Sequence, residues 1–586
     1  MLRILKQLSS REWIQIALSL FFIAAQVGLD LKLPDYMSEI TRLVQTPGST
    51  PGEIWAQGQF MLLCVFGSAI SAIVIGFLAA RVAASFSQRL RSMLFTKVDS
   101  FSMEEINRFS TASLITRTTN DIIHIQMLIT MGLMLVIKAP IMAVWAVTKI
   151  AGKGFEWSLA TAAAVLILAI FFIFILIFVM PKFRIMQVLT DDLNKVTREN
   201  LTGLRVIRAY NAESYQEEKF EQVNEELTET HLFTSRAMAL VMPVMNMVMS
   251  GLSLAIYWIG AYLISEAGVT DKLPIFSNMV VFSAYAVQVI MSFVMMAMIF
   301  IMLPRASVSA KRINEVLDTE PALREGRARS GKEELAGQIE FKNVSFKYPG
   351  AAEYVLREIS FTVKQGQTVA IIGSTGSGKS TLINLVPRFY DVTDGEVLVN
   401  GINVKGYASE ALHNKIGYVP QKAVLFRGTV SSNVAFGENG KPAATAEDIK
   451  KAIAIAQGTN FVEAMKDQYQ GEIARGGTNL SGGQKQRLSI ARAICRKPEF
   501  YLFDDSFSAL DYKTDHLLRR TLQKETAGVT TLIVAQRIGT IMEADQIIVL
   551  DKGRLVGKGT HKELLATCSI YKEIARSQFD KEELAS

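Results

Sequence analysis

The stretch VAIIGSTGSGKST, residues 369–381, decides the fold of the C-terminal half of this chain. Its first four apolar residues predict a buried β-strand. The residues that follow have the spacing G-x-x-x-x-G-K-S and lead into a predicted helix. Glycines in such a loop let backbone N–H groups surround phosphate oxygens, and the helix N-terminus adds a favourable dipole. We therefore expect a site for nucleotide phosphates, made of Gly373, Ser374, Thr375, Gly376, Ser377, Gly378, Lys379, Ser380 and Thr381.

Two further motifs follow in the order expected of a nucleotide-hydrolysing domain. EFYLFDDSFSALD, residues 499–511, is an apolar β-run that ends in two carboxylates. Asp504 at the strand end is the expected Mg²⁺ residue, acting together with Ser380. LSGGQKQR, residues 480–487, lies between the two motifs and predicts a second group of phosphate-facing N–H donors at a helix start.

The composition divides the chain into two halves. Half of its 586 residues are hydrophobic, and the apolar runs concentrate before residue 304. Six of these runs reach the roughly 20 residues that a membrane-spanning helix needs. They are Trp13–Leu33, Ala56–Ala80, Met127–Ile150, Trp157–Met180, Ala237–Ile264 and Ile275–Leu303. From residue 338, short β-runs alternate with helices, which predicts an α/β domain with a largely parallel sheet.

These patterns predict four regions. Residues 1–12 form an amphipathic helix at the membrane interface. Residues 13–304 form an all-α transmembrane domain with six spanning helices and two long intracellular loops. Residues 305–337 form a charged linker, and residues 338–586 form the α/β nucleotide-binding domain. The long loops after the second and fourth segments are rich in Lys and Arg, so we expect both termini in the cytoplasm.

The net charge of +7 has an ordinary explanation in such a protein. Cytoplasmic loops of membrane proteins carry an excess of Lys and Arg. The basic residues are not accompanied by the aromatic residues typical of nucleic-acid grooves. We therefore expect the lipid bilayer, and no nucleic acid, as a partner.

Taken together, the chain resembles the exporter branch of the ATP-binding-cassette (ABC) transporter family. Six spanning helices before one nucleotide-binding domain is the layout of a half-transporter, and ATP with Mg²⁺ is the implied ligand. The resemblance implies that Tyr348 stacks on adenine and that Gln421 is the Q-loop residue that senses Mg²⁺. It also implies a signature motif formed by Ser481, Gly482, Gly483 and Gln484, which contacts the ATP of a partner domain.

Two positions depart from the family pattern. The residue after the Mg²⁺-binding Asp is normally Glu, the base that orients the attacking water, and here it is Asp505. The switch-loop residue is normally His, and here it is Gln536. Asp carries its carboxylate farther back, and Gln cannot become a cation. We expect a degenerate site that binds ATP and hydrolyses it poorly, although Asp505 and Gln536 as working variants are the alternative.

An intact signature motif beside a degenerate site implies a second half-transporter as the partner. The chain is then one subunit of a heterodimeric, ATP-driven multidrug efflux translocase in a bacterial cell membrane. One alternative is a homodimeric lipid or drug flippase. The other is an ATP-gated channel or a regulatory ABC subunit.

The substrate is expected to be a hydrophobic small molecule. Met is flexible and polarizable, so a Met-rich cavity accepts varied apolar shapes. Charges within a membrane segment are costly and mark functional sites. The candidate cavity residues are therefore Lys138, Met245, Met249 and Met295. The alternatives are that the Met residues only pack against helices or lipid, and that Lys138 extends to the interface.

Overall fold

The computed structural model describes residues 2–46, 48–151, 154–268 and 271–578. It divides into two units. The helical unit contains Met1–Asp99 and Ala112–Thr319, and the sheet unit contains Ser100–Thr111 and Glu320–Ser586.

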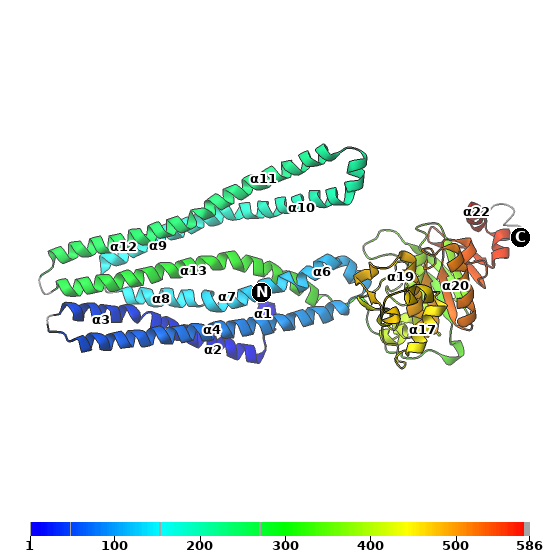
Figure 1. The fold of residues 1–586 in the computed structure, drawn as a ribbon, viewed down its shortest axis with the longest axis horizontal. Helices are drawn as coiled ribbons and strands as arrows, with labels where there is room; N and C mark the ends of the chain where they lie inside the picture. The colour runs from blue at the N-terminus through cyan, green and yellow to red at the C-terminus, as the bar shows by residue number, and fades with distance from the viewer. Residues whose placement is uncertain (1, 47, 152–153, 269–270, 579–586) are drawn as a thin grey trace. The chain divides into compact units, whose positions relative to one another are not determined.

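The helical unit consists of long helices and two short π-helical turns (Figure 1). Helices α2, α3, α4, α7, α8 and α13 pack together, while α9–α12 form a second group that contacts α13. The bounds are α1 Leu2–Leu5, α2 Ser10–Asp30, α3 Leu33–Gln45, α4 Pro51–Asp99, α6 Thr111–Thr118, α7 Asn120–Met131, η1 Gly132–Val136, α8 Lys138–Ile150, α9 Phe155–Phe174, η2 Ile175–Val179, α10 Met180–Ala209, α11 Glu213–Ala239, α12 Val241–Glu266 and α13 Lys272–Asp318.

Six stretches of the described residues are long and apolar enough to cross a membrane. This confirms the predicted number of spanning helices and their all-α class. The helices extend well beyond the apolar segments predicted from the sequence. α4, for example, has 49 residues. At 1.5 Å per residue it is about 74 Å long, more than twice the roughly 30 Å of a bilayer's hydrocarbon core.

Two expected boundaries differ from the structure. The N-terminal helix ends at Leu5 instead of continuing to residue 12, because Ser9 and Glu12 form a capping box that starts α2. The linker begins at Thr319 instead of residue 305, because α13 continues to Asp318. The buried residues Ala306, Ala310, Ile313 and Val316 lie three or four positions apart, so one packed face keeps this charged stretch helical.

The sheet unit contains a six-stranded, largely parallel sheet, a four-stranded antiparallel sheet and a two-stranded antiparallel pair of β7 and β8. The six-stranded sheet has the order β12-β11-β3-β10-β9-β6 and is parallel except for the β11–β12 pair. This confirms the predicted parallel sheet. The antiparallel sheet, of order β2-β1-β4-β5, was not predicted. The strand bounds are β1 Ile339–Phe346, β2 Leu356–Val363, β3 Thr368–Gly373, β4 Asp394–Val399, β5 Ile402–Asn403, β6 Ile416–Val419, β7 Gly428–Thr429, β8 Glu472–Ile473, β9 Phe500–Asp504, β10 Thr530–Val534, β11 Gln546–Asp551 and β12 Arg554–Gly559.

The helices of the sheet unit are shorter than those of the helical unit. Their bounds are α5 Met103–Phe109, α14 Lys379–Asn384, α15 Ser409–His413, α16 Val430–Val434, α17 Ala446–Ile455, α18 Thr459–Glu463, α19 Gly482–Cys495, α20 Tyr512–Glu525, α21 His561–Thr567 and α22 Ser569–Gln578, with 3₁₀ turns η3 Glu333–Leu335, η4 Val404–Gly406, η5 Gln468–Gln470, η6 Arg475–Gly477 and η7 Ile538–Thr540.

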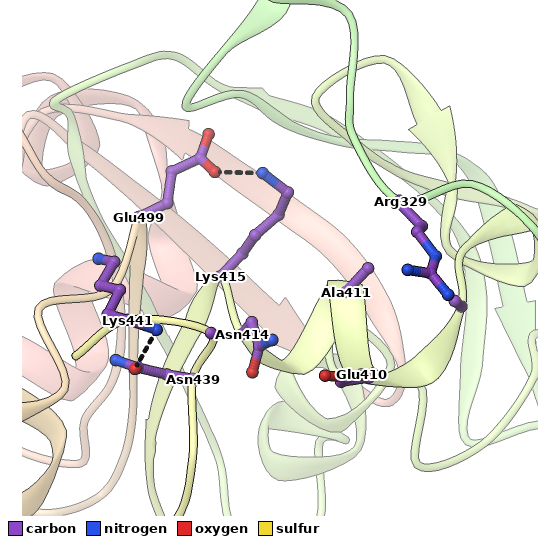
Figure 2. Close-up of a pocket in the computed structure, with 10 residues that line it drawn as sticks. Arg329, Glu410, Ala411, Asn414, Lys415, Asn439, Lys441 and Glu499 are labelled. Atoms are coloured by element: carbon purple, nitrogen blue, oxygen red, sulfur yellow. Dashed lines mark hydrogen bonds and ion pairs between the residues drawn. The ribbon is translucent and has the colours of Figure 1, made fainter. Parts of the chain in front are cut away.

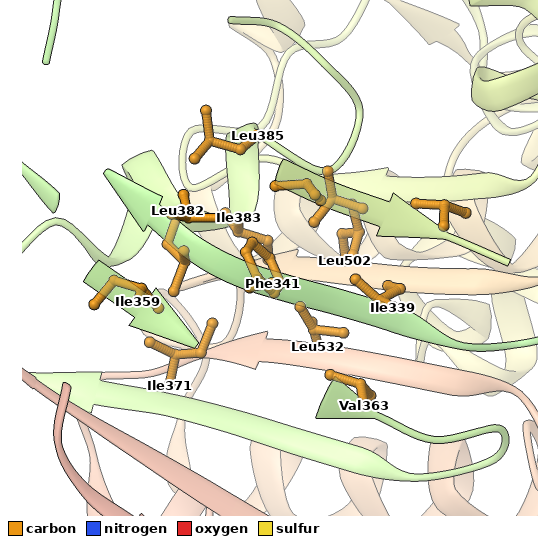
Figure 3. Close-up of a cluster of buried hydrophobic side chains, with 14 of the residues drawn as sticks. Ile339, Phe341, Ile359, Val363, Ile371, Leu382, Ile383, Leu385, Leu502 and Leu532 are labelled. Carbon is orange, nitrogen blue, oxygen red and sulfur yellow. The ribbon is translucent and has the colours of Figure 1, made fainter. Parts of the chain in front are cut away.

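A hydrophobic core joins the two sheets and fixes the strand before the phosphate loop. Ile371 of β3 packs with Leu382 and Ile383 of α14 and with Phe341 of the antiparallel sheet (Figure 3). The alternate residues Ala370 and Ile372 face a different cluster on the other side of the sheet. β3 is therefore buried on both faces, as its continuous apolar run predicts. The loop between β3 and α14 consequently starts and ends on packed elements.

Candidate nucleotide-binding site

Parallel pairing brings the candidate residues to one edge of the sheet. Val534 at the end of β10 pairs with Asp504 of β9 and with Ile371 of β3. Val419 at the end of β6 pairs with Phe503. The carboxyl ends of parallel strands are where open α/β sheets bind ligands. The residues just beyond these ends are the phosphate loop, Asp505, Gln536 and Gln421.

The phosphate loop has the backbone that phosphate binding requires. Gly376 and Gly378 have φ of +83° and +93°, and a Cβ on Gly378 would lie 2.7 Å from a side-chain carbon of Leu356. Glycine is needed there for both reasons. Ser374, Thr375 and Gly376 are exposed, whereas Ser377 is buried and its Oγ has no hydrogen-bond partner. The Lys379 ammonium donates to the carbonyls of Gly373 and Ser374, each at 2.8 Å.

Ser380 and Asp504 form a pair suited to Mg²⁺. The hydroxyl of Ser380 donates to Oδ1 of Asp504 at 2.7 Å. Burial raises the pKa of Asp504 even though Ser380 stabilises its charged form. The described residues contain no cluster of three or more His, Cys, Asp or Glu side chains for a metal. Mg²⁺ usually takes one or two protein oxygens and completes its shell with phosphate and water. The donor set therefore fits Mg²⁺ bound together with a nucleotide.

Asp505 is held by hydrogen bonds from both neighbouring loops. Its Oδ2 accepts from Nε2 of Gln536 at 2.7 Å and from Nε2 of Gln421 at 3.2 Å. Its backbone N–H donates to Val534, and its carbonyl accepts from the Ser508 hydroxyl. The residue has φ of +46°, a left-handed conformation that Asp adopts more readily than most residues. The two departures from the family pattern are thus direct hydrogen-bond partners.

Tyr348 lies beside the phosphate loop. Its hydroxyl is 3.0 Å from Oγ1 of Thr381, and its ring meets Tyr390 edge-on at 5.3 Å. Tyr390 in turn accepts a hydrogen bond from Asn107 of α5 at 3.2 Å. α5 is the only helix of the N-terminal half that clusters with the sheet unit in the described chain. Tyr390 therefore contacts both Asn107 of α5 and Tyr348, the residue expected to stack on adenine.

The signature motif begins a helix and is accessible. Ser481 caps α19, and Gln484 completes the capping box with its own side chain. Ser481 and Gly482 are exposed, and a Cβ on Gly482 would meet no atom within 4 Å. The capping box uses the backbone N–H groups of Ser481 and Gln484. The N–H groups of Gly482 and Gly483, in the first turn of α19, are the ones left to face an anion on another molecule. Gly483 and Gln484 are half-buried.

A separate cavity in the sheet unit is lined by none of these motif residues. Figure 2 shows its polar lining, which includes Arg329, Glu410 and Asn439. Lys415 and Glu499 form an ion pair there at 2.7 Å. The charged lining is of mixed sign, with Arg329, Lys415 and Lys441 beside Glu410 and Glu499.

In the helical unit, Lys138 has a partner that the sequence reasoning missed. Its ammonium lies 3.2 Å from a carboxylate oxygen of Asp30, which also accepts a hydrogen bond from Ser68. Farther along the same helix α8, Lys149 pairs with Asp35 of α3 at 2.7 Å. The presence of Asp30 in an apolar span, matched by a lysine in another span, is the signal that predicts such a pair.

Most of the candidate Met residues pack between helices. Met245 is buried and Met249 is partly buried in the same hydrophobic cluster, which includes Trp157, Phe282 and Tyr285. Met295 is half-buried. The structure therefore gathers Met245 and Met249 in one cluster, while Lys138 makes its polar contacts with Asp30.

Comparison with known proteins identifies the family. Residues 16–293 match the ABC transporter transmembrane region, and residues 356–508 match the ABC transporter nucleotide-binding family. An uncharacterized ABC transporter ATP-binding protein of Mycobacterium tuberculosis is 39% identical over 94% of this chain and 93% of its own. YfiB of Bacillus subtilis, another such protein, is 37% identical over 90% of both chains.

Two further relatives are informative. An ATP-dependent lipid A-core flippase of Pseudomonas putida is 30% identical, over 86% of this chain and 82% of the relative. The solved structure of a bacterial Atm1-family ABC exporter with ATP bound has the same fold, with a TM-score of 0.76 over 97% of this chain and 99% of that one, at 23% identity. With one transmembrane region and one ATP-binding domain in its sequence, the chain belongs to the ABC transporter family and is an exporter half-transporter.

Proposed function

We propose that this chain is the degenerate subunit of a heterodimeric efflux transporter. It binds ATP at its own site, hydrolyses it poorly, and lends its signature motif to the hydrolytic site of a second half-transporter. The observation that carries the proposal is the hydrogen bond from Gln536 to Asp505. It joins the two positions that depart from the hydrolytic pattern of the family.

The geometry at Asp505 favours binding over hydrolysis. Burial raises the pKa of Asp505, which by itself favours proton acceptance. Position opposes this effect. An Asp carboxylate lies farther from a γ-phosphate than that of Glu, and about 1 Å of misplacement can lower a rate about 100-fold. Two amide donors also occupy Oδ2. Position outweighs basicity, because a base that cannot reach the attacking water does not accept its proton.

The groups that bind the nucleotide are intact. Lys379 and the loop N–H groups would hold the β- and γ-phosphates, and Tyr348 would stack on adenine. Ser380 and Asp504, with Gln421, would hold Mg²⁺, which neutralises charge on the phosphates. Gln536 can still donate to a γ-phosphate oxygen, but it remains neutral. The site is therefore suited to retain ATP between the two nucleotide-binding domains.

The transport cycle follows from this division of roles. ATP binding would close the paired domains, and hydrolysis at the partner's site would reopen them. Ser481, Gly482 and the α19 N-terminus would contact the partner's ATP. The cargo would be a hydrophobic small molecule, and Lys138 and the Met residues would line its route. The protein would work in a bacterial cell membrane with both termini in the cytoplasm.

A homodimeric flippase is the second candidate. The specific support is the 30% identity to the lipid A-core flippase of Pseudomonas putida. In that case both ATP sites of the dimer would contain Asp505 and Gln536. A purified homodimer with vigorous ATP turnover would favour the flippase.

The test of the proposal is to isolate the protein with its natural partner. An affinity-tagged chain is extracted from its native membrane, and its companions are identified by mass spectrometry. We expect a second half-transporter with Glu and His at the positions of Asp505 and Gln536. Recovery of a homodimer alone, with robust ATP hydrolysis, would contradict the proposal.

A further inference from the structure

Gln578, at the end of the C-terminal helix α22, binds the switch segment, defined here as residues 536–538. Its Oε1 accepts a hydrogen bond from the backbone N–H of Ile538 at 2.8 Å. Its Nε2 donates to the backbone carbonyl of Gln536, also at 2.8 Å. A carboxamide offers one acceptor and one pair of donors. Here they bind the two backbone groups that flank Arg537, the N–H of Ile538 and the carbonyl of Gln536. One side chain thus holds both ends of the switch segment.

The packing of α22 explains why Gln578 lies there. Tyr571 and Ala575 are fully buried, and Gln578 follows at the spacing that keeps it on the same helix face. Both buried residues share a hydrophobic cluster with Ala535, Ile538 and Ile541, in and around the η7 turn. The Tyr571 hydroxyl lies 2.7 Å from Nδ1 of His561, which anchors the helix to α21. α22 therefore docks directly on the segment that Gln578 binds.

The switch segment leads to the nucleotide site through two side chains. Gln536 donates to Asp505, as described above. Arg537 donates to the carbonyl of Ser508 at 3.5 Å, in the loop that follows Asp505. A shift of this backbone would therefore move the two side chains of the switch segment, Gln536 and Arg537, that contact the Asp505–Ser508 loop. Gln578 is the contact that opposes such a shift from the far side.

We propose that Gln578 is a positioning residue that fixes the switch segment and thereby slows the release of ATP from this chain's site. The proposal rests on the proposed function, since it assumes that this site holds nucleotide. It goes beyond it by assigning a role to α22, which carries none of the nucleotide motifs.

The experiment uses the full-length chain in lipid nanodiscs with three variants. Gln578→Ala removes both hydrogen bonds. Gln578→Glu keeps an acceptor for Ile538 N–H but replaces the donor to Gln536 with a repelling oxygen. Ser577→Ala is the matched control, because its hydroxyl bonds only within α22, to Ile574. Melting curves check that all variants fold.

The first measurement is amide hydrogen exchange of the nucleotide-free protein over residues 535–542. Loss of a hydrogen bond of average strength should speed exchange about 10-fold in Gln578→Ala. Gln578→Glu should keep most of the protection of Ile538, and Ser577→Ala should match the wild type. Unchanged exchange in Gln578→Ala would overturn the proposal.

The second measurement is the dissociation rate of radiolabelled MgATP. We expect about 3- to 10-fold faster release from Gln578→Ala and Gln578→Glu, and no change in Ser577→Ala. Faster exchange without faster release would overturn the link to nucleotide retention. Failure of this proposal can be told apart from failure of the proposed function. Robust ATP hydrolysis by the wild type would refute the proposed function, whereas the hydrogen-exchange result is obtained without nucleotide and does not depend on it.

Discussion

Nε2 of Gln536 donates a hydrogen bond to Oδ2 of Asp505 over 2.7 Å, although the residues are 31 positions apart. In the family pattern these positions hold a His and a Glu. Here a neutral amide meets a shortened carboxylate, and Gln421 donates to the same oxygen. Gln536 and Asp505 thus form an amide–carboxylate contact at the positions where the family pattern has an acid–base pair. Its consequences can be measured.

The first prediction concerns Asp504 and pH. Because burial raises the pKa of Asp504, the folded protein binds its proton more tightly than the unfolded chain does. The ionised carboxylate therefore destabilises the fold at neutral pH. Asp504→Asn should raise the melting temperature of the nucleotide-free protein at pH 7. The difference should shrink as the pH falls through the raised pKa and vanish below that of a free aspartate.

The same variant should lose the Mg²⁺-dependent part of ATP binding. A hydrogen bond or ligand bond to a charged group contributes about 1.5–3 kcal/mol, so affinity should fall about 10- to 100-fold. Melting with and without MgATP measures both effects. Asp467→Asn, at an exposed position of the same domain, is the control. A variant that is less stable without nucleotide at pH 7 would refute the burial argument.

The second prediction concerns Tyr348. Stacking of a base on an aromatic ring contributes about 1–3 kcal/mol, so Tyr348→Leu should weaken ATP binding about 10-fold. Tyr348→Phe keeps the ring and removes only the hydroxyl contact with Thr381. It should bind ATP within about twofold of the wild type. Equal affinities for all three proteins, measured by equilibrium binding, would show that the Tyr348 ring only packs against Phe346 and Tyr390.

The third prediction concerns the membrane ion pair. Lys138→Ala leaves Asp30 without its cation in an apolar span, so the variant should be less stable than the wild type. Removing both charges in Asp30→Ala/Lys138→Ala should restore part of the loss. We expect a coupling of about 0.5–3 kcal/mol in a double-mutant cycle of thermal unfolding in detergent. Additive losses would mean that the pair does not interact.

Transport assays on these variants test the cavity assignment. If Lys138 lines the substrate route, Lys138→Ala should change the preference between anionic and cationic drugs. The double variant should show the same change, since both lack the ammonium. An unchanged efflux profile in membranes with normal protein levels would limit Lys138 to a structural role.

The fourth prediction concerns the signature motif. Ser481→Ala should reduce hydrolysis by the heterodimer about 10-fold or more, because the hydroxyl is lost from the partner's site. ATP affinity at this chain's own site should not change. Ser481 also caps α19, so Thr445→Ala is the matched control: Thr445 closes a similar capping box on α17. If Thr445→Ala lowers hydrolysis equally, the effect is one of helix stability.

Much of the fold follows from local patterns. The apolar runs predict the spans, and the run before Gly373 predicts a strand buried on both faces. The ordered motifs predict the residues at the sheet edge. These features depend on neighbours in sequence, so the sequence contains them directly.

The contacts within the site depend on tertiary pairing. The register of Val534 against Asp504 sets the distance between Gln536 and Asp505, and no local pattern encodes it. Asp30 and Lys138 meet across 108 positions for the same reason. The charged residues after residue 304 predict a linker, whereas the buried face through Val316 keeps the segment helical to the end of α13. The contacts of Gln578 with residues 536 and 538 depend on the docking of α22, which no local pattern encodes.

Under the proposed function, Asp505 and Gln536 make this site retain ATP instead of hydrolysing it. The most direct measurement compares ATP turnover by the purified wild-type chain with that of Asp505→Glu/Gln536→His, with Lys379→Ala added to confirm the site. We predict ATP binding with little turnover in the wild type and at least about 10-fold faster hydrolysis in the double variant, abolished by Lys379→Ala. Vigorous hydrolysis by the wild type, or a double variant that binds ATP but is no faster, would contradict the claim.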